Sequence, residues 1–445
     1  MTTAPEPAAT DLARDLADGR VTALEVTDAC LRRLEIEEPR VRVWAHLDPA
    51  HARAQAEALD ARKRAGRPLG RLHGLPVGVK DIYDTADLPT ENGSVLDSGR
   101  RPTRDAWVVA RLRAEGAVIL GKTVTTEYAC FAPGPTRNPH DPGRTPGGSS
   151  SGSAAAVAAG VVPVAIGSQT NGSVIRPASF CGVHGLKPSF GLIPRTGCLA
   201  TSRTLDTVGF FARSLDDLAL LGEVLAGYDE GDPATRPTPA PPFVRALGER
   251  QPAPPRLAFV RGPTWEQAEP ATREAFAELV EALGAHVHEV GLPPAFDDAI
   301  GVHRTIWTAE LAFLLRDRWE RGAESLSPQL RTLIEDGRAV PAVTYQDALV
   351  RRAAYVRDLE AVLHEHDAIV TPAAPGEAPR GLEATGSPAF CSLWSLTGLP
   401  ALSLPILQGP GGLPLGCQLV GAPGDDARLL RLARWLETTI AAEPA

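Results

Sequence analysis

The chain has 445 residues, of which 43% are hydrophobic and 22% are charged, so it can bury a large core. Its formal net charge is -9 and it has no basic stripe that would neutralise a phosphate backbone, so we expect no nucleic-acid partner. No stretch approaches 18 uninterrupted apolar residues, and the N-terminus lacks a basic segment followed by an apolar one. We therefore expect a cytoplasmic protein that does not associate with a membrane.

The first 70 residues are predicted to form helices. Thr22 and Glu25 have the spacing of a capping box, and an apolar-periodic stretch from Val26 to Leu34 follows them. A second, alanine-rich helix is predicted from Pro49 to Ala65. Residues 1–70 are accordingly assigned to an N-terminal helical region.

Strand and helix patterns alternate in the next region, which we assign as a catalytic core over residues 71–227. Short apolar runs predict strands, and the longer patterns between them predict helices. The predicted strands are Leu75 to Val79, Val118 to Leu120 and Val161 to Ile166, and the predicted helices are Asp105 to Glu115 and Ser153 to Ala159. Such alternation predicts an α/β fold in which helices cover a sheet.

Residues 228–256 are dense in proline, which favours an exposed surface connection over core structure. Strand and helix patterns resume in residues 257–445, which we expect to complete the sheet and the substrate cleft. The predicted strands are Leu257 to Val260, His286 to Val290, Ala368 to Val370, Ala401 to Pro405 and Gln418 to Val420, and the predicted helices are Ala271 to Leu283 and Asp425 to Glu437.

Cysteine and histidine spacing gives no reason to expect disulfides or a metal. The six cysteines contain no CxxC pair, which favours reduced and mostly buried thiols. The pairs His286 with His288 and His364 with His366 each lack a third ligand at a plausible offset. We expect no metal and no organic cofactor.

Two short motif matches are rejected on their context. Residues 116–123 fit the GxxxxGK[ST] pattern of a phosphate loop, but their variable positions read as a strand that follows a helix. Residues 148–152 fit the GxSxG nucleophile elbow, with Ser150 at its centre. An elbow needs an apolar strand before it, and the preceding NPHDPGRTPG cannot form one. An α/β-hydrolase-type esterase therefore stays a weaker alternative.

Residues 143–194 carry a longer and more specific pattern. They read GRTPGGSSSGSAAAVAAGVVPVAIGSQTNGSVIRPASFCGVHGLKPSFGLIP, which resembles the glycine- and serine-rich region of the amidase signature family. Segments at 74–94 and 134–142 and the C-terminal LTGLPALSLPI and GLPLGCQLVGAPGDDARLLRLA resemble that family too. The form QTNGSVIRP is closest to compact, malonamidase-type bacterial members. The resemblance implies one large α/β domain with a mixed, twisted central sheet covered by helices on both faces.

The resemblance also implies a catalytic triad of Ser173, Ser149 and Lys80, in which Ser173 is the nucleophile, Ser149 relays the proton and Lys80 is the base. It further implies a cis peptide bond between Gly148 and Ser149. Lys80 follows an apolar run, so we expect its amine to enter a desolvated site where its pKa falls toward that of a useful base. Lysine is scarce in this chain, which suggests that each one does something arginine cannot.

The turn before Ser173 is expected to supply an oxyanion hole from the backbone N–H groups of Thr170, Asn171, Gly172 and Ser173. The family commonly has an acidic residue at the position of Gln169 and a glycine at the position of Asn171. Because asparagine tolerates unusual backbone angles, the turn can keep its shape.

Several further residues are candidates for supporting roles. Ser150 is expected to orient the nucleophile or the lysine, with helix capping as the alternative. Arg176 is expected to pair with a substrate carboxylate, with a structural ion pair as the alternative. The aromatic residues Tyr128 and Phe131 are candidates for the wall of an apolar substrate cleft, as are Trp307 and Trp394, with core packing as the alternative.

We therefore expect a hydrolase of amide-type carbon–nitrogen bonds, acting on a small amide or carbamate (urethane) substrate through an acyl-enzyme. A homodimer is one assembly the sequence allows. The alternative is an amidase-like subunit of an amidotransferase complex. Only four residues, Cys130 to Pro133, separate TEYA from GPTRNP where many relatives carry a longer loop. This short segment favours a wider cleft and speaks against the amidotransferase subunit.

Overall fold

The computed structural model describes residues 7–442 and contains one eleven-stranded mixed sheet in the order β1-β3-β2-β4-β6-β5-β10-β11-β9-β7-β8. Strand β2 runs parallel to β3 and β4, and β7 runs parallel to β8 and β9, whereas the remaining pairs are antiparallel. The strands are β1 Trp44–Leu47, β2 Pro76–Lys80, β3 Val118–Thr123, β4 Val164–Gln169, β5 His184–Lys187, β6 Thr207–Ala212, β7 Leu257–Phe259, β8 Val287–Glu289, β9 Ala368–Pro372, β10 Ala401–Gln408 and β11 Pro414–Val420. The expected α/β fold with a mixed sheet is confirmed.

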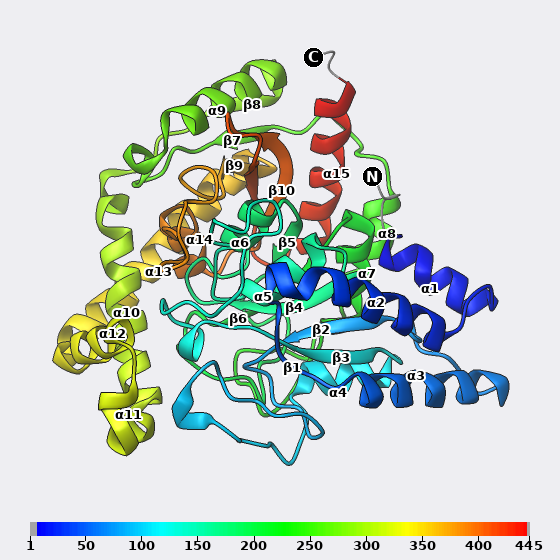
Figure 1. Ribbon diagram of the computed structural model, residues 1–445. Coiled ribbons are helices and arrows are strands. Elements are labelled where there is room, and N and C mark those ends of the chain that lie inside the picture. Colours follow the sequence, from blue (N-terminus) through cyan, green and yellow to red (C-terminus); the bar gives the residue numbers. More distant parts are fainter. Residues whose placement is uncertain (1–6, 443–445) are drawn as a thin grey trace.

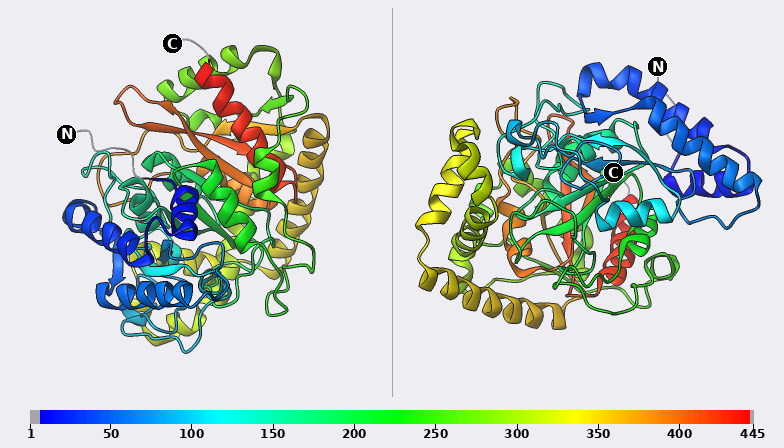
Figure 2. Two further views of the ribbon diagram at one scale, coloured as in Figure 1. Left: turned by 90° about the vertical axis from the view of Figure 1, so that its right-hand side faces the viewer. Right: turned by 90° about the horizontal axis from the view of Figure 1, so that it is seen from below.

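The predicted N-terminal helices are present and lie along one flank of the molecule (Figures 1 and 2). Thr22 and Glu25 form the expected capping box at the start of the second helix, and Asp48 caps the third. These helices are α1 Ala9–Asp18, α2 Ala23–Val41 and α3 Pro49–Arg64.

The core helices pack against the sheet in two groups. Helices α5 and α6 contact the central strands, while α7, α8 and α15 pack together and cover the sheet beside β5, β6, β10 and β11. The bounds are α4 Trp107–Ala114, α5 Ser151–Ala158, α6 Ile175–Cys181, α7 Leu215–Leu225, α8 Phe243–Gly248 and α15 Asp426–Ala442. The segment that matched a phosphate loop is indeed a helix end followed by strand β3, with Gly116 at φ 83°.

A further set of helices lies on the flank opposite α1 to α3 (Figure 2, yellow to orange). All but the first of them contribute side chains to a second cluster of buried apolar residues, whereas the buried apolar side chains of that first helix belong to the larger cluster around the sheet. Their bounds are α9 Pro270–Leu283, α10 Ala299–Leu314, α11 Arg316–Gly322, α12 Pro328–Ala339, α13 Ala342–Glu365 and α14 Ala389–Thr397. Six short 3-10 helices are found in the described residues, at Val95–Asp97, Glu127–Ala129, Trp265–Gln267, Gly284–His286, Pro294–Asp298 and Ala323–Ser325.

The proline-rich stretch 228–256 is only partly the exposed connection that its composition predicts. Its residues are mostly exposed, but helix α8 lies inside it and packs against α7 and α15. Phe243 is fully buried there and Leu247 is nearly so. Two apolar side chains at helical spacing override the proline signal, because burying them is worth more than leaving the segment extended.

Candidate active site

Lys80 ends strand β2 and is completely buried. Its Nζ lies 2.7 Å from Ser149 Oγ and 2.9 Å from Ser168 Oγ. No carboxylate forms an ion pair with it among residues 7–442. Burial without a counter-ion lowers the pKa of Lys80 from 10.5 to about 7. A large fraction of Lys80 is therefore neutral at neutral pH.

Ser149 stands just before helix α5, and the peptide bond between Gly148 and Ser149 is cis. The carbonyl of Gly148 accepts a hydrogen bond from Arg176 Nη2 at 2.6 Å, and the carbonyl of Ser149 accepts one from the amide of Thr126. The position of Gly148 leaves no room for a side chain, because a Cβ there would lie 2.8 Å from Thr385 Cγ2. Hydrogen bonds to the carbonyls of Gly148 and Ser149 thus hold the backbone of the serine that faces Lys80 in place.

Ser150 is fully buried and its hydroxyl is paired with the backbone of Ser168. The hydroxyl accepts a hydrogen bond from the Ser168 amide and donates one to the Ser168 carbonyl, both at 3.2 Å. Ser168 is the residue whose hydroxyl lies beside Lys80. Ser150 therefore acts on the lysine's surroundings through strand β4, and it makes no side-chain cap of helix α5.

Ser173 sits in the turn between β4 and α6 and is 8% exposed. The side chain of Gln169 organises this turn. Its Oε1 accepts hydrogen bonds from the amides of Val174 at 2.8 Å and Ile175 at 3.0 Å, which satisfies the first amides of α6. Its Nε2 donates to Ser395 Oγ. The glutamine thus serves as a neutral acceptor where an acidic residue is common in the resembled family.

The backbone carbonyls of Thr170, Asn171 and Gly172 each accept a hydrogen bond. Thr170 O accepts from His303 Nε2 at 3.0 Å, Asn171 O accepts from Ser395 Oγ at 2.5 Å, and Gly172 O accepts from the Arg176 amide at 3.1 Å. Among residues 7–442 we find no hydrogen bond donated by the amides of residues 171–173. The turn therefore presents free N–H groups, which is the arrangement an oxyanion hole requires.

Thr170 is also fixed by a buried polar network that no sequence pattern indicates. Its hydroxyl donates to Asp206 Oδ1 at 2.5 Å. Asp206 also accepts from the hydroxyl and amide of Thr201 at 2.8 Å and from the amide of Ser202 at 2.9 Å. Burial nevertheless raises the pKa of this carboxyl. Asp206 lies in TSRTLD, where a single Asp in a polar turn has no distinguishing signal.

Arg176 lies in helix α6, and its side chain is buried. Its guanidinium donates to the carbonyls of Thr385, Gly386 and Gly148 and to the Thr385 hydroxyl. The alternative of a structural ion pair is wrong, because no carboxylate pairs with Arg176 in the described chain. Burial lowers its pKa to about 10. The contacts give Arg176 a role in holding the Gly148 carbonyl, and its contact with substrate stays a prediction.

The predicted aromatic residues lie within the second apolar cluster. Tyr128 is fully buried, with a left-handed φ of 44°, and Phe131 is half-buried against Trp307, with the two ring centroids 5.5 Å apart. Trp307 and Trp394 are both buried, so core packing is their main role. Phe131 is the most exposed of the four to solvent and stays a candidate for the cleft wall.

The histidine pairs noted in the sequence do not join a metal cluster. No group of three or more His, Cys, Asp or Glu residues is placed to hold a metal ion within residues 7–442. In the same range, no helix is long and apolar enough to cross a membrane. The six cysteines are free thiols, and all but the half-buried Cys198 are buried.

Known proteins resemble this chain over almost its whole length. The profile of the family described as Amidase matches residues 25–430. A glutamyl-tRNA(Gln) amidotransferase subunit of Chloroflexus aggregans is 38% identical over 94% of this chain and 93% of its own length. A chain described as part of a vestigial protein complex that reveals the origins of an s-triazine catabolic enzyme superposes with TM-score 0.91 at 31% identity, covering 97% and 98% of the two chains. The peptide amidase of Stenotrophomonas maltophilia superposes with TM-score 0.84 at 30% identity, covering 99% and 98%.

Proposed function

The chain belongs to the Amidase family, and on that premise we propose that it cleaves the carbon–nitrogen bond of a small amide at Ser173 through an acyl-enzyme. The observation that carries the proposal is the buried Lys80 amine, which lies 2.7 Å from Ser149 Oγ with a pKa lowered to about 7. A neutral amine in that position can accept a proton, whereas an ordinary lysine is charged at neutral pH.

The first half of the reaction forms the acyl-enzyme. Ser173 Oγ attacks the amide carbon while its proton passes to Ser149 and the Ser149 proton passes to Lys80 Nζ. The new oxyanion is stabilised by the free amides of residues 171–173. When the intermediate collapses, the carbon–nitrogen bond breaks, and Lys80 returns the proton through Ser149 to the departing nitrogen. Ammonia or an amine leaves, and the acyl group stays on Ser173.

The second half of the reaction repeats the same proton path with water. A water molecule attacks the ester carbon, and Ser149 and Lys80 accept its proton. The proton is then given back to Ser173 as the ester bond breaks and the carboxylic acid leaves. No group outside Lys80, Ser149, Ser173 and the turn is required for either step.

A second candidate is a subunit of an amidotransferase, which would pass the released ammonia to a partner protein. The names of the curated relatives favour it, since proteins named as glutamyl-tRNA(Gln) amidotransferase subunits cover almost the whole chain at 34–38% identity. The short segment Cys130 to Pro133 argues against the amidotransferase subunit. Amide cleavage at Ser173 is common to both candidates, and they differ in the fate of the ammonia.

Serine labelling and turnover test the proposal. We expect a fluorophosphonate probe to modify Ser173 in the isolated protein, and we expect Ser173→Ala and Lys80→Ala to abolish both labelling and release of ammonia from a primary amide. Ser150→Ala should still be labelled at Ser173, because the Ser150 hydroxyl is hydrogen-bonded to the backbone of Ser168 and not to Ser173 in the described chain. Labelling at Ser150, or full turnover by Ser173→Ala or Lys80→Ala, would refute the assignment.

A direct assay distinguishes a self-sufficient hydrolase from an amidotransferase subunit. A self-sufficient hydrolase releases ammonia and the carboxylic acid in the absence of any other protein, across a panel of anilides, carbamates and half-amides such as malonamate. A subunit is instead expected to be labelled and to turn over only when its partner is added. Cleavage of carbamates is the finer part of this proposal, and the same panel tests it.

A further inference from the structure

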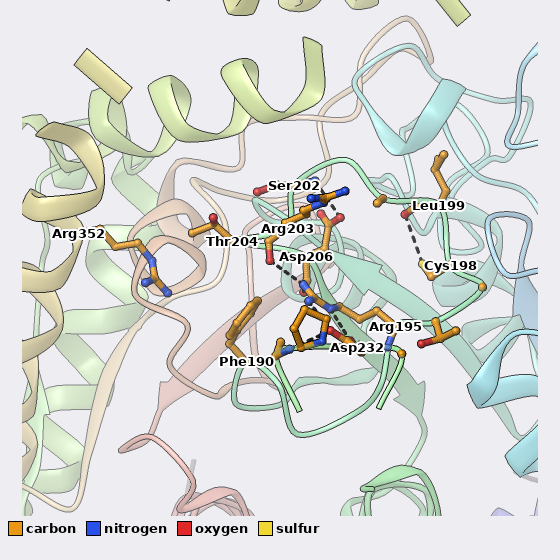
Figure 3. Close-up of a pocket in the computed structure, with 16 residues that line it drawn as sticks. Phe190, Arg195, Cys198, Leu199, Ser202, Arg203, Thr204, Asp206, Asp232 and Arg352 are labelled. Carbon is orange, nitrogen blue, oxygen red and sulfur yellow. Dashed lines mark hydrogen bonds and ion pairs between the residues drawn. The ribbon is translucent and has the colours of Figure 1, made fainter. Parts of the chain in front are cut away.

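A large cavity lies between the loop after β5, the segment around Asp232 and helix α13 (Figure 3). Its volume is about 820 Å³, which is within the range of roughly 300–1,000 Å³ that is usual for small-molecule sites. Within residues 7–442, neither Lys80, Ser149 nor the turn 171–173 lines it. A molecule held in this cavity is therefore not positioned for attack by the catalytic serine.

Arg352 reaches toward this cavity from α13, on the side opposite Cys198 and Leu199 (Figure 3). It is half-buried, and no carboxylate lies within ion-pair distance of it in the described chain. Its one hydrogen bond among the described residues runs from Nε to the carbonyl of Leu396 at 2.6 Å. Because a guanidinium has five N–H groups, the four on its Nη atoms are free to bind a ligand.

Glu310 attracts Arg352 electrostatically, but its carboxylate is engaged elsewhere. It accepts hydrogen bonds from the hydroxyls of Thr204 at 2.5 Å and Tyr345 at 2.8 Å, and also from that of Ser202. Burial outweighs its attraction and lowers the pKa of Arg352. A partly desolvated cation that lacks a partner is stabilised by a ligand that supplies the opposite charge.

The acidic side chains of the cavity wall are already paired or hydrogen-bonded. Asp232 forms an ion pair with Arg195 at 2.8 Å. Asp206 accepts hydrogen bonds from two threonine hydroxyls and two amides, and burial raises its pKa. Arg203 also lines the cavity and forms no ion pair in the described chain. Arg203 and Arg352 therefore leave positive charge at this cavity, although the whole chain has a net charge of -9.

Apolar surface accompanies this charge. The Phe190 ring lies in the cavity wall, together with Leu199, Pro233 and Ala234. Phe190, Pro233 and Ala234 also line an adjacent cavity of about 610 Å³, and so does Arg352, so the two spaces meet at the arginine. The site thus offers contacts to a carbon skeleton as well as to an anionic group.

Two hydrogen-bonded connections run from the cavity wall to the oxyanion turn. The carbonyl that accepts from Arg352 belongs to the residue after Ser395 in α14, and Ser395 Oγ donates to the carbonyl of Asn171 at 2.5 Å. Asp206, in the cavity wall, accepts a hydrogen bond from the Thr170 hydroxyl at 2.5 Å. A ligand that restrains these wall residues therefore acts on the backbone that holds the free amides of the turn.

We propose that this cavity binds a small organic anion, a carboxylate or a phosphate ester, at Arg352 and Arg203, and that the bound anion changes the rate of the reaction at Ser173 without reacting itself. A planar guanidinium pairs with either kind of anion through two parallel hydrogen bonds. Phe190 packs against the carbon skeleton. The effect on the rate rests on the proposed cleavage at Ser173, whereas binding of the anion does not.

Calorimetric titration of the wild-type protein with succinate and with phenyl phosphate tests binding, and the tighter of the two shows whether the site prefers a carboxylate or a phosphate. Arg352→Gln is expected to weaken binding of this preferred anion by roughly tenfold or more, since a charge-assisted pair is lost. Arg352→Lys, which keeps the charge but not the planar donor pair, should fall between the two proteins. Arg203→Gln should weaken binding by about threefold, because Arg203 is exposed.

Arg357→Gln is the matched control, because Arg357 lies on the same helix with its side chain exposed. It should bind the preferred anion as the wild type does, and an equal loss in this variant would overturn the site. Inorganic phosphate and the uncharged 1,4-butanediol should bind more weakly, because the first leaves Phe190 uncovered and the second leaves Arg352 unpaired. Equally tight binding of either compound, failure of both organic anions to bind, or binding unaffected by Arg352→Gln would overturn the site as well.

Turnover of a primary amide, measured with and without a saturating concentration of the preferred anion, tests the effect on the rate. The anion should change kcat by roughly twofold or more at constant KM, and Arg352→Gln should abolish this response. A rise in KM alone would mean that the anion competes with the amide in the catalytic cleft. That result, or unchanged kinetics, would overturn the effect on the rate. Arg352-dependent binding by a protein whose wild type cleaves no amide would refute the proposed function but leave the anion site standing.

Discussion

Replacing Lys80 by methionine should make the protein more stable and inactive. Lys80 is completely buried with its pKa lowered from 10.5 to about 7 by burial. One pKa unit corresponds to about 1.4 kcal/mol, so holding this lysine unprotonated in the fold at pH 7 costs about 5 kcal/mol. Methionine fits the same space without a charge. It leaves two serine hydroxyls without the amine, at about 1 kcal/mol each, so a net gain of about 3 kcal/mol is expected at pH 7.

The difference in the free energy of unfolding between the wild type and Lys80→Met is expected to depend on pH. Between pH 7 and about 10 the unfolded chain holds the Lys80 proton and the folded chain does not. The stability of the wild type therefore rises with pH by up to about 1.4 kcal/mol per unit relative to Lys80→Met. Below pH 7, Lys80 is protonated in both the folded and the unfolded wild type, so the difference in stability between the two proteins no longer changes with pH. The advantage of the methionine variant should thus be largest at or below pH 7 and shrink toward pH 10.

Urea unfolding followed by tryptophan fluorescence at pH 7, 8 and 9 measures the difference between the two proteins. Lys187→Met is the matched control, because burial also lowers the pKa of Lys187 to about 7, while its amine donates a hydrogen bond to the Pro188 carbonyl and none to Ser149 or Ser173 in the described chain. It should show the same trend in stability and keep amide turnover. A stability difference that does not change with pH would mean that Lys80 is charged in the fold, and the reasoning about its role as a base would fail.

Three further outcomes follow from the site. The kcat/KM for a primary amide should rise with pH through about 7, as Lys80 loses its proton, and a rate independent of pH from 6 to 8 would contradict this. Gly172→Ala should lower kcat while Gly291→Ala does not, because an added Cβ meets Pro388 Cβ at 2.9 Å in the first case and nothing within 4 Å in the second. Asp206→Asn should lower kcat roughly 10²-fold with little change in KM, because it loosens Thr170; equal changes in both constants would count against a positioning role.

Much of the fold was predictable because it depends on local patterns. Strands β2, β3 and β9 and helices α3 and α9 fall where short apolar runs and helical periodicity placed them. The β5 to β6 pair and helices α10 to α13 were not predicted. The pairing partners of β5 include β10, about 200 residues away, so no local pattern reveals its place in the sheet.

The resemblance of residues 143–194 to the amidase signature region was enough to identify the family and to predict Lys80, Ser149 and Ser173 as its catalytic residues. The surroundings of these residues became known from the folded chain alone. Asp206, His303 and Ser395 reach the oxyanion turn from 36, 133 and 224 residues away, and Arg176 is closed in by backbone carbonyls instead of a carboxylate. Such contacts form only when sheet pairing and helix packing bring distant segments together, and therefore no spacing along the chain encodes them.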